Sequence, residues 1–225
     1  IVVGVLFISA TVATSVSQVI LAPILGTPDF LVNVSENHSQ VMLGIVLELV
    51  DAFAVVAIAI AMYPLANNYH GGLAIGYVGF RVIEATIFIT ASVSLLSLST
   101  LSQEYTLSDS AESSIFENSG ILLIAAHEWA YLLMLIAFCL GALIFYYLLY
   151  QSSLIPHALS AWGFVAAAMA LVTCLLQLFG VIADGSTISN TLFLPIALQE
   201  MVMAFWLIIK GFNFTSISSE SSHSP

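Results

Sequence analysis

The chain has 225 residues, of which 60% are hydrophobic and only 7% are charged, and its formal net charge at pH 7 is -11. An ordinary soluble domain has about 25% charged residues, so this composition excludes a water-soluble protein. Only two Lys and Arg residues face thirteen Asp and Glu residues. This balance argues against nucleic acid as a partner, because phosphate groups recruit basic side chains.

Six long apolar segments follow one another along the sequence. A membrane-spanning helix needs about 20 apolar residues, and each segment reaches that length. The sequence therefore predicts an all-α integral membrane helical bundle with six transmembrane helices, a single domain over residues 1–212 whose main partner is the lipid bilayer. The predicted helices are residues 1–25, 41–65, 72–98, 120–150, 158–182 and 191–212.

The first segment is expected to be a retained helix and not a cleaved signal sequence. It holds about 25 uncharged residues, which exceeds the apolar core of a signal peptide. The sequence opens on Ile1 and not on Met, so a few natural residues are expected to precede it. Two long polar connections are predicted at residues 26–40 and 99–119, and the Ser-rich tail 213–225 is expected to be disordered.

The distribution of charge over the connections predicts a topology. An even number of spans places both termini on one side, and the acidic residues between spans fall in the odd-numbered connections. The even-numbered connections, residues 66–71 and 151–157, have no carboxylate, and Lys210 ends the sixth span. Because basic residues mark the cytoplasmic side, both termini are expected inside.

Several ionisable residues lie inside predicted spans, where a charge at the bilayer centre costs about 2.5 to 3.5 kcal/mol. Two pairs are spaced i, i+3, which puts each pair on one face of its helix. Counting the helix rise places Asp51, Arg81, Glu84 and Glu200 in one layer near the midplane. The candidate ligand-binding or ion-binding residues are Glu48, Asp51, Arg81, Glu84, His127, Glu128 and Glu200.

These candidates carry an excess of negative charge. Five carboxylates and one guanidinium cannot all stay ionised in a medium of low dielectric, so some carboxyls are protonated or a cation lies among them. One interpretation is a midplane cavity that binds or moves a cation, a proton or a small polar ligand. The other is a set of neutral hydrogen bonds that only specifies helix packing in a structural or accessory subunit.

Two further hypotheses concern chemistry at the fourth span. A membrane-embedded lipid-modifying enzyme could use His127 or Glu128 as a general base and Arg81 to stabilise charge. A metal site is less favoured, because zinc usually takes two or three His or Cys ligands and His127 is the one His inside a span. Cys139 and Cys174 lie in apolar segments and are expected to be small buried side chains that form no disulfide.

Motifs in order along the chain resemble a bacterial and archaeal membrane family catalogued as domain of unknown function 4386. The strongest are GFRVIEA at 79–85, HEWA at 127–130, FYYLLYQS at 145–152 and LSAWG at 159–163. The resemblance implies a compact multi-span bundle without an established activity, in a prokaryotic cell membrane. This sequence departs from the family in the cytoplasmic turns, where family members commonly carry Lys or Arg and this chain carries neither. The positions matching its polar signature are Glu48, Arg81, Glu84, His127, Glu128 and Glu200.

Overall fold

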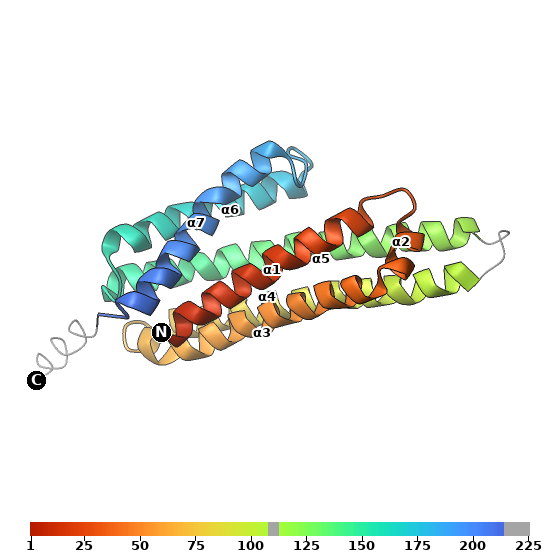
Figure 1. The fold of residues 1–225 in the computed structure, drawn as a ribbon. Helices are drawn as coiled ribbons and strands as arrows, with labels where there is room; N and C mark the ends of the chain where they lie inside the picture. The colour runs from red at the N-terminus through yellow and green to blue at the C-terminus, as the bar shows by residue number, and fades with distance from the viewer. Residues whose placement is uncertain (108–112, 214–225) are drawn as a thin grey trace, which may run out of the picture. The chain divides into compact units, whose positions relative to one another are not determined.

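The computed structural model describes residues 1–107 and 113–213, and its regular secondary structure over these residues is entirely helical (Figure 1). All of the helices except α2 are long and apolar enough to cross a membrane, which makes six candidate spans. The prediction of an all-α chain with six spans is therefore confirmed. The helices are α1 (Val2–Leu25), α2 (Phe30–Glu36), α3 (His38–Asn67), α4 (Gly71–Leu107), α5 (Ser113–Ser152), α6 (His157–Leu178) and α7 (Thr187–Ile209).

The connection expected at residues 99–119 is mostly helical, which corrects the predicted boundaries. Helix α4 continues to Leu107 and α5 begins at Ser113. Residues 99–107 contain no Gly or Pro, and a helix satisfies its own backbone hydrogen bonds in water as well as in lipid, so polar side chains alone do not end it. The remainder, residues 108–112, lies outside the described residues, as do residues 214–225 of the tail 213–225 that was expected to be disordered.

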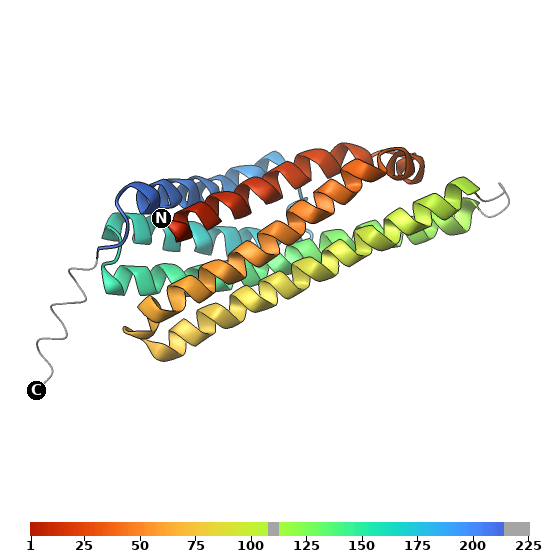
Figure 2. The ribbon, with the colours of Figure 1, turned by 60° about the horizontal axis from the view of Figure 1, so that its bottom comes forward.

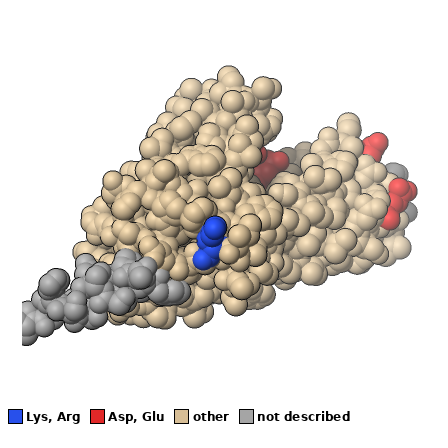
Figure 3. All heavy atoms as spheres, turned by 60° about the vertical axis from the view of Figure 1, so that its left-hand side comes forward, with Lys and Arg blue, Asp and Glu red and all other residues tan. Residues whose placement is uncertain are grey.

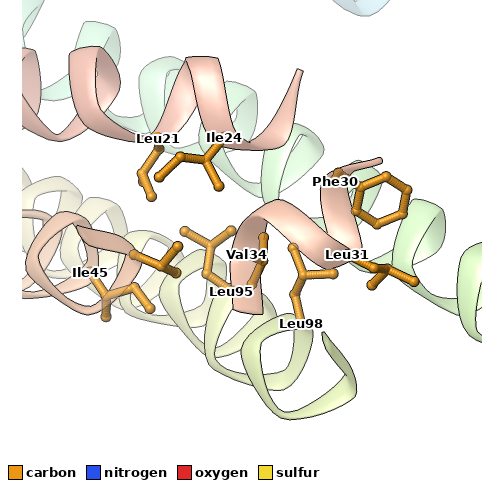
Figure 4. Close-up of a cluster of buried hydrophobic side chains, with 9 residues drawn as sticks. Leu21, Ile24, Phe30, Leu31, Val34, Ile45, Leu95 and Leu98 are labelled. Atoms are coloured by element: carbon orange, nitrogen blue, oxygen red, sulfur yellow. The ribbon is translucent and has the colours of Figure 1, made fainter. Parts of the chain in front are cut away.

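The connection expected at residues 26–40 contains a short helix, α2, whose apolar face is buried. Leu31 is 2% exposed and Val34 is fully buried, and both pack in a hydrophobic cluster with Leu21 and Leu95 (Figure 4). The hydroxyl of Ser102 donates a hydrogen bond to the carbonyl of Leu31. Burial of its apolar side chains therefore stabilises a helix in this segment, although the polar residues around it predicted a loop.

Contacts divide the chain into two compact units, which we describe separately. Unit 1 comprises Ile1–Ile8, Ala54–Glu84 and the chain from Leu135 onward, and unit 2 comprises Ser9–Phe53 and Ala85–Met134. Helices α6 and α7 belong entirely to unit 1 and pack against each other. Helix α2 belongs entirely to unit 2, and the other four helices contribute residues to both units.

The two ends of the described chain lie at one end of unit 1. A Cβ atom added to Gly4 would lie 2.6 Å from the carbonyl oxygen of Ala204, so glycine allows the first turn of α1 to touch α7. Both ribbon views show the start of α1 beside the end of α7 (Figures 1 and 2). The backbone N–H of Asn213 donates to the carbonyl of Leu154 at 2.9 Å. An even number of spans accounts for this arrangement, while the side of the membrane stays a prediction.

Aromatic rings fill the interior of unit 1. The rings of Tyr77 and Phe145 stack with centroids 4.9 Å apart, and Phe145 also contacts Phe7 and Tyr146. Gly163 lies against the Tyr146 ring, which occupies the space that a Cβ would need.

The two cysteines are also in this unit. Cys139 and Cys174 are both fully buried free thiols. The prediction that they are small buried side chains is confirmed.

Candidate functional site

Arg81 and Glu84 form a buried ion pair on α4. Arg81 is 2% exposed and Glu84 is 4% exposed, and Arg81 Nη1 donates to Glu84 Oε1 at 3.1 Å and to Oε2 at 3.0 Å. The i, i+3 spacing brings the two side chains to one helix face, as the sequence predicted. Pairing with a carboxylate offsets part of the cost of removing the guanidinium from water.

Two aromatic rings lie beside the guanidinium, and two buried polar atoms in this region have no hydrogen-bond partner. Its central carbon lies 5.4 Å from the ring centroid of Tyr77 and 5.2 Å from that of Phe138, within the range of cation–π attraction. Arg81 Nε and the Tyr77 hydroxyl are buried and have no hydrogen-bond partner among the described residues. Arg81 Nε is a donor and the Tyr77 hydroxyl can donate or accept, so the two groups can satisfy each other or a bound hydrogen-bond acceptor.

Glu200 on α7 lies close enough to Arg81 for a Coulombic attraction that is weaker than that of Glu84. It is partly buried, and its charge acts on Arg81 together with that of Glu84. The preceding residue, Gln199, is fully buried; it accepts a hydrogen bond from the Tyr146 hydroxyl and donates to the carbonyl of Leu159 at 3.2 Å. These bonds fix the turn of α7 that carries Glu200. Within unit 1, two carboxylates therefore act on one guanidinium.

Unit 2 contains a second buried polar cluster centred on Glu48, which comes from α3. Glu48 is 1% exposed, and both of its carboxyl oxygens are engaged. His127 Nε2 on α5 lies 2.9 Å from Oε1, and the hydroxyl of Ser92 on α4 donates to Oε2 at 2.6 Å. An imidazole nitrogen approaches a carboxyl oxygen this closely only when a proton lies between them. The cluster therefore joins three helices through hydrogen bonds of one carboxyl group to an imidazole and a hydroxyl.

The remaining two candidates in unit 2 differ in their surroundings. Asp51 is 9% exposed, and its Oδ2 accepts a hydrogen bond of 2.7 Å from the hydroxyl of Thr14 on α1. Glu128 is exposed on α5, although the adjacent His127 is buried. Successive helical residues are about 100° apart around the axis, so these two neighbours cannot face the same partner. The structure brings Glu48 and His127 together and leaves Glu128 on the outside of its helix.

Among the described residues, no group of three or more His, Cys, Asp or Glu side chains is placed to hold a metal ion.

The model of the family described as Domain of unknown function (DUF4386) matches residues 2–211, which include both buried clusters. The chain belongs to this family. No curated protein and no solved structure matches it. The family description assigns no activity, so its two polar clusters carry the functional argument.

The sequence pattern did not single out three neighbours of the buried charged groups. Ser92, Thr14 and Tyr77 are uncharged, and hydroxyl side chains are common in spans, so burial cost does not single them out. One signal was available on α4, where residues 77, 81, 84, 88 and 92 follow a spacing of four, three, four and four. That spacing describes one helix face, and it extends the Arg81 and Glu84 pattern to Tyr77 in one direction and Ser92 in the other.

Proposed function

We propose that this family member binds and exchanges protons at buried carboxyl groups of its spans, as a proton-coupled binding or transport protein in a prokaryotic cell membrane. The observation that carries the proposal is the charge imbalance of unit 1, where Arg81 is hydrogen-bonded to Glu84 and is also attracted by the more distant charge of Glu200. One guanidinium neutralises one carboxylate. A second ionised carboxylate in this setting is costly, so it is neutralised by a proton.

The geometry around Arg81 favours Glu200 as the group that exchanges this proton. Glu84 uses both carboxyl oxygens to accept hydrogen bonds from Arg81 Nη1, which stabilises its ionised form. Glu200 is partly exposed, whereas Glu84 is 4% exposed, so Glu200 is the less enclosed of the two carboxyl groups. In this arrangement, Glu84 compensates Arg81 permanently, and Glu200 gains and loses the proton.

The Glu48 cluster supports the same class of function. An ionised Glu48 and a neutral His127 together carry one negative charge, so one additional proton makes the pair electrically neutral. Losing that proton leaves a net negative charge in a site where Glu48 is 1% exposed. A buried net charge is costly, which makes this pair a second candidate site for a proton.

The enzyme alternative with His127 as general base receives less support, because His127 is 6% exposed and its Nε2 is engaged by Glu48. In a nucleophilic triad the base contacts the hydroxyl that it activates. Here Ser92 and His127 each bond to a different oxygen of Glu48, so Glu48 stands between the hydroxyl and the imidazole. The arrangement suits proton storage better than activation of a nucleophile.

Infrared difference spectroscopy of the protein in detergent tests the proposal. We expect a protonated carboxyl band near neutral pH, where ordinary carboxyl groups are ionised, and we expect it to be absent in Glu200→Gln. The matched control is Glu104→Gln, which removes an exposed carboxyl near the end of α4 and should leave the band unchanged. If Glu200→Gln retains the band and elemental analysis finds stoichiometric metal, a cation and not a proton neutralises the site.

Proton movement is measured separately in proteoliposomes containing a pH-sensitive dye. Under an imposed pH gradient, we expect wild-type protein to accelerate equilibration and Glu200→Gln to abolish the acceleration, with Glu104→Gln as the control. A titrating band without any accelerated flux would support proton binding alone and would contradict transport.

A further inference from the structure

A hollow separate from both buried clusters lies at the end of unit 1 where the chain's described termini meet. Its volume is about 530 Å³, and it is formed by the turn between α5 and α6 together with the end of α7. The residues that give it chemistry are Ser153, His157, Trp206, Lys210 and Asn213, and none of its lining residues is acidic.

The charge of this hollow is opposite to that of the rest of the chain. Lys210 is the one Lys of the sequence, and Arg81, the other basic residue, is buried and paired. In the face shown in Figure 3, one basic side chain stands on the surface among uncharged atoms. An anion approaching a protein with a net charge of -11 therefore finds one accessible Lys or Arg, and it lines this hollow.

Polar groups in the wall formed by the α5–α6 turn complement the ammonium group. Ser153 Oγ and His157 Nε2 lie 3.2 Å apart, and helix α6 begins at His157 without a side-chain cap. The first N–H groups of a 22-residue helix give this wall a partial positive charge. An ammonium, a hydroxyl, an imidazole and a helix N-terminus around one hollow form a set that suits a phosphate group.

The position of the hollow relative to the spans indicates the source of the phosphate. Lys210 directly follows the last helical residue of α7, and Trp206, one turn earlier, is 36% exposed. Trp and Lys at the end of a span mark the level of the lipid headgroups. We propose that this hollow binds the phosphate of an anionic phospholipid headgroup, with Lys210 as the charged contact and Trp206 against the glycerol and upper acyl region.

Native mass spectrometry of the full chain in detergent tests this site with phosphatidylglycerol and phosphatidylcholine as probes. We expect the wild type to retain phosphatidylglycerol in preference to phosphatidylcholine. Lys210→Gln should reduce that preference by about fivefold, the effect typical of one basic residue near anionic lipid. Lys210→Arg should keep the preference, because the charge is unchanged.

The matched control is Asn68→Asp, which makes the same change in net charge at an exposed turn that does not line the hollow. It should leave the preference intact. An equal loss in Asn68→Asp and Lys210→Gln would mean that overall charge, and not a site, selects the lipid. Equal retention of the two lipids by the wild type would also overturn the proposal.

Inorganic phosphate, added without lipid in a thermal unfolding assay, distinguishes the two sources of the anion. For a lipid site, phosphatidylglycerol raises the unfolding temperature of the wild type more than that of Lys210→Gln, while phosphate at the same concentration leaves both unchanged. If phosphate alone stabilises the wild type as strongly as the lipid does and Lys210→Gln removes the effect, the ligand is a free phosphate compound and the lipid assignment is wrong.

Discussion

Replacement of Arg81 by Met should destabilise the protein far more than an equal loss of charge at its surface. Arg81 is 2% exposed and bonds to both carboxyl oxygens of Glu84. Removing one partner of such a pair leaves the other charge buried, which typically costs about 3 to 5 kcal/mol. A protein of this size loses about 2 to 4 °C of melting temperature per kcal/mol, so we expect a decrease of about 6 to 20 °C.

Replacing Arg81 and replacing Glu84 should destabilise the protein by different amounts, because unit 1 has two carboxylates near one guanidinium. After Arg81→Met, neither Glu84 nor Glu200 has a compensating cation, and one must take up a proton. After Glu84→Gln, Glu200 still acts on Arg81, and the rings of Tyr77 and Phe138 remain beside the guanidinium. Glu84→Gln should therefore lower the melting temperature by less than Arg81→Met does.

The chain carries its own reporter for this measurement. Cys139 and Cys174 are fully buried free thiols, so a thiol-reactive fluorophore labels them when the bundle unfolds in detergent. Lys210→Met removes the other basic charge at an exposed position and should shift the midpoint by no more than about 1 °C to 2 °C. Equal shifts for Arg81→Met and Lys210→Met would mean that Arg81 reaches water, which would refute the burial argument.

Two further predictions use the same thermal assay. Glu48→Met removes the hydrogen-bond partner of the buried His127 imidazole and should cost about 1 to 3 kcal/mol of stability. Its control, Glu128→Met at an exposed position, should change stability by less than about 0.5 kcal/mol. Equal losses would contradict the described cluster. Gly163→Ala should cost about 1 to 3 kcal/mol, because the new methyl group overlaps the ring of Tyr146. Its control, Gly79→Ala, meets no atom within 4 Å and should be neutral or stabilising, so equal destabilisation would point to helix flexibility and not to packing.

The sequence by itself determined the six spans and the residues that are costly to bury. Span length depends on the thickness of the bilayer and composition on its lack of water, and both are visible in one dimension. The pairing of Arg81 with Glu84 was equally accessible, because i, i+3 neighbours share a face of one helix whatever surrounds it. The folding of residues 30–36 as α2 was less accessible, since its burial depends on side chains from other helices.

Only the tertiary structure decided which polar groups meet across helices. His127 and Glu128 are indistinguishable in sequence, yet one bonds to Glu48 and the other is exposed. The rotation of each helix about its axis sets such contacts, and it results from packing along the whole length of neighbouring helices, including small residues such as Gly163. The hollow beside Lys210 has the same origin, because its walls come from the α5–α6 turn and the end of α7, more than fifty residues apart in the sequence.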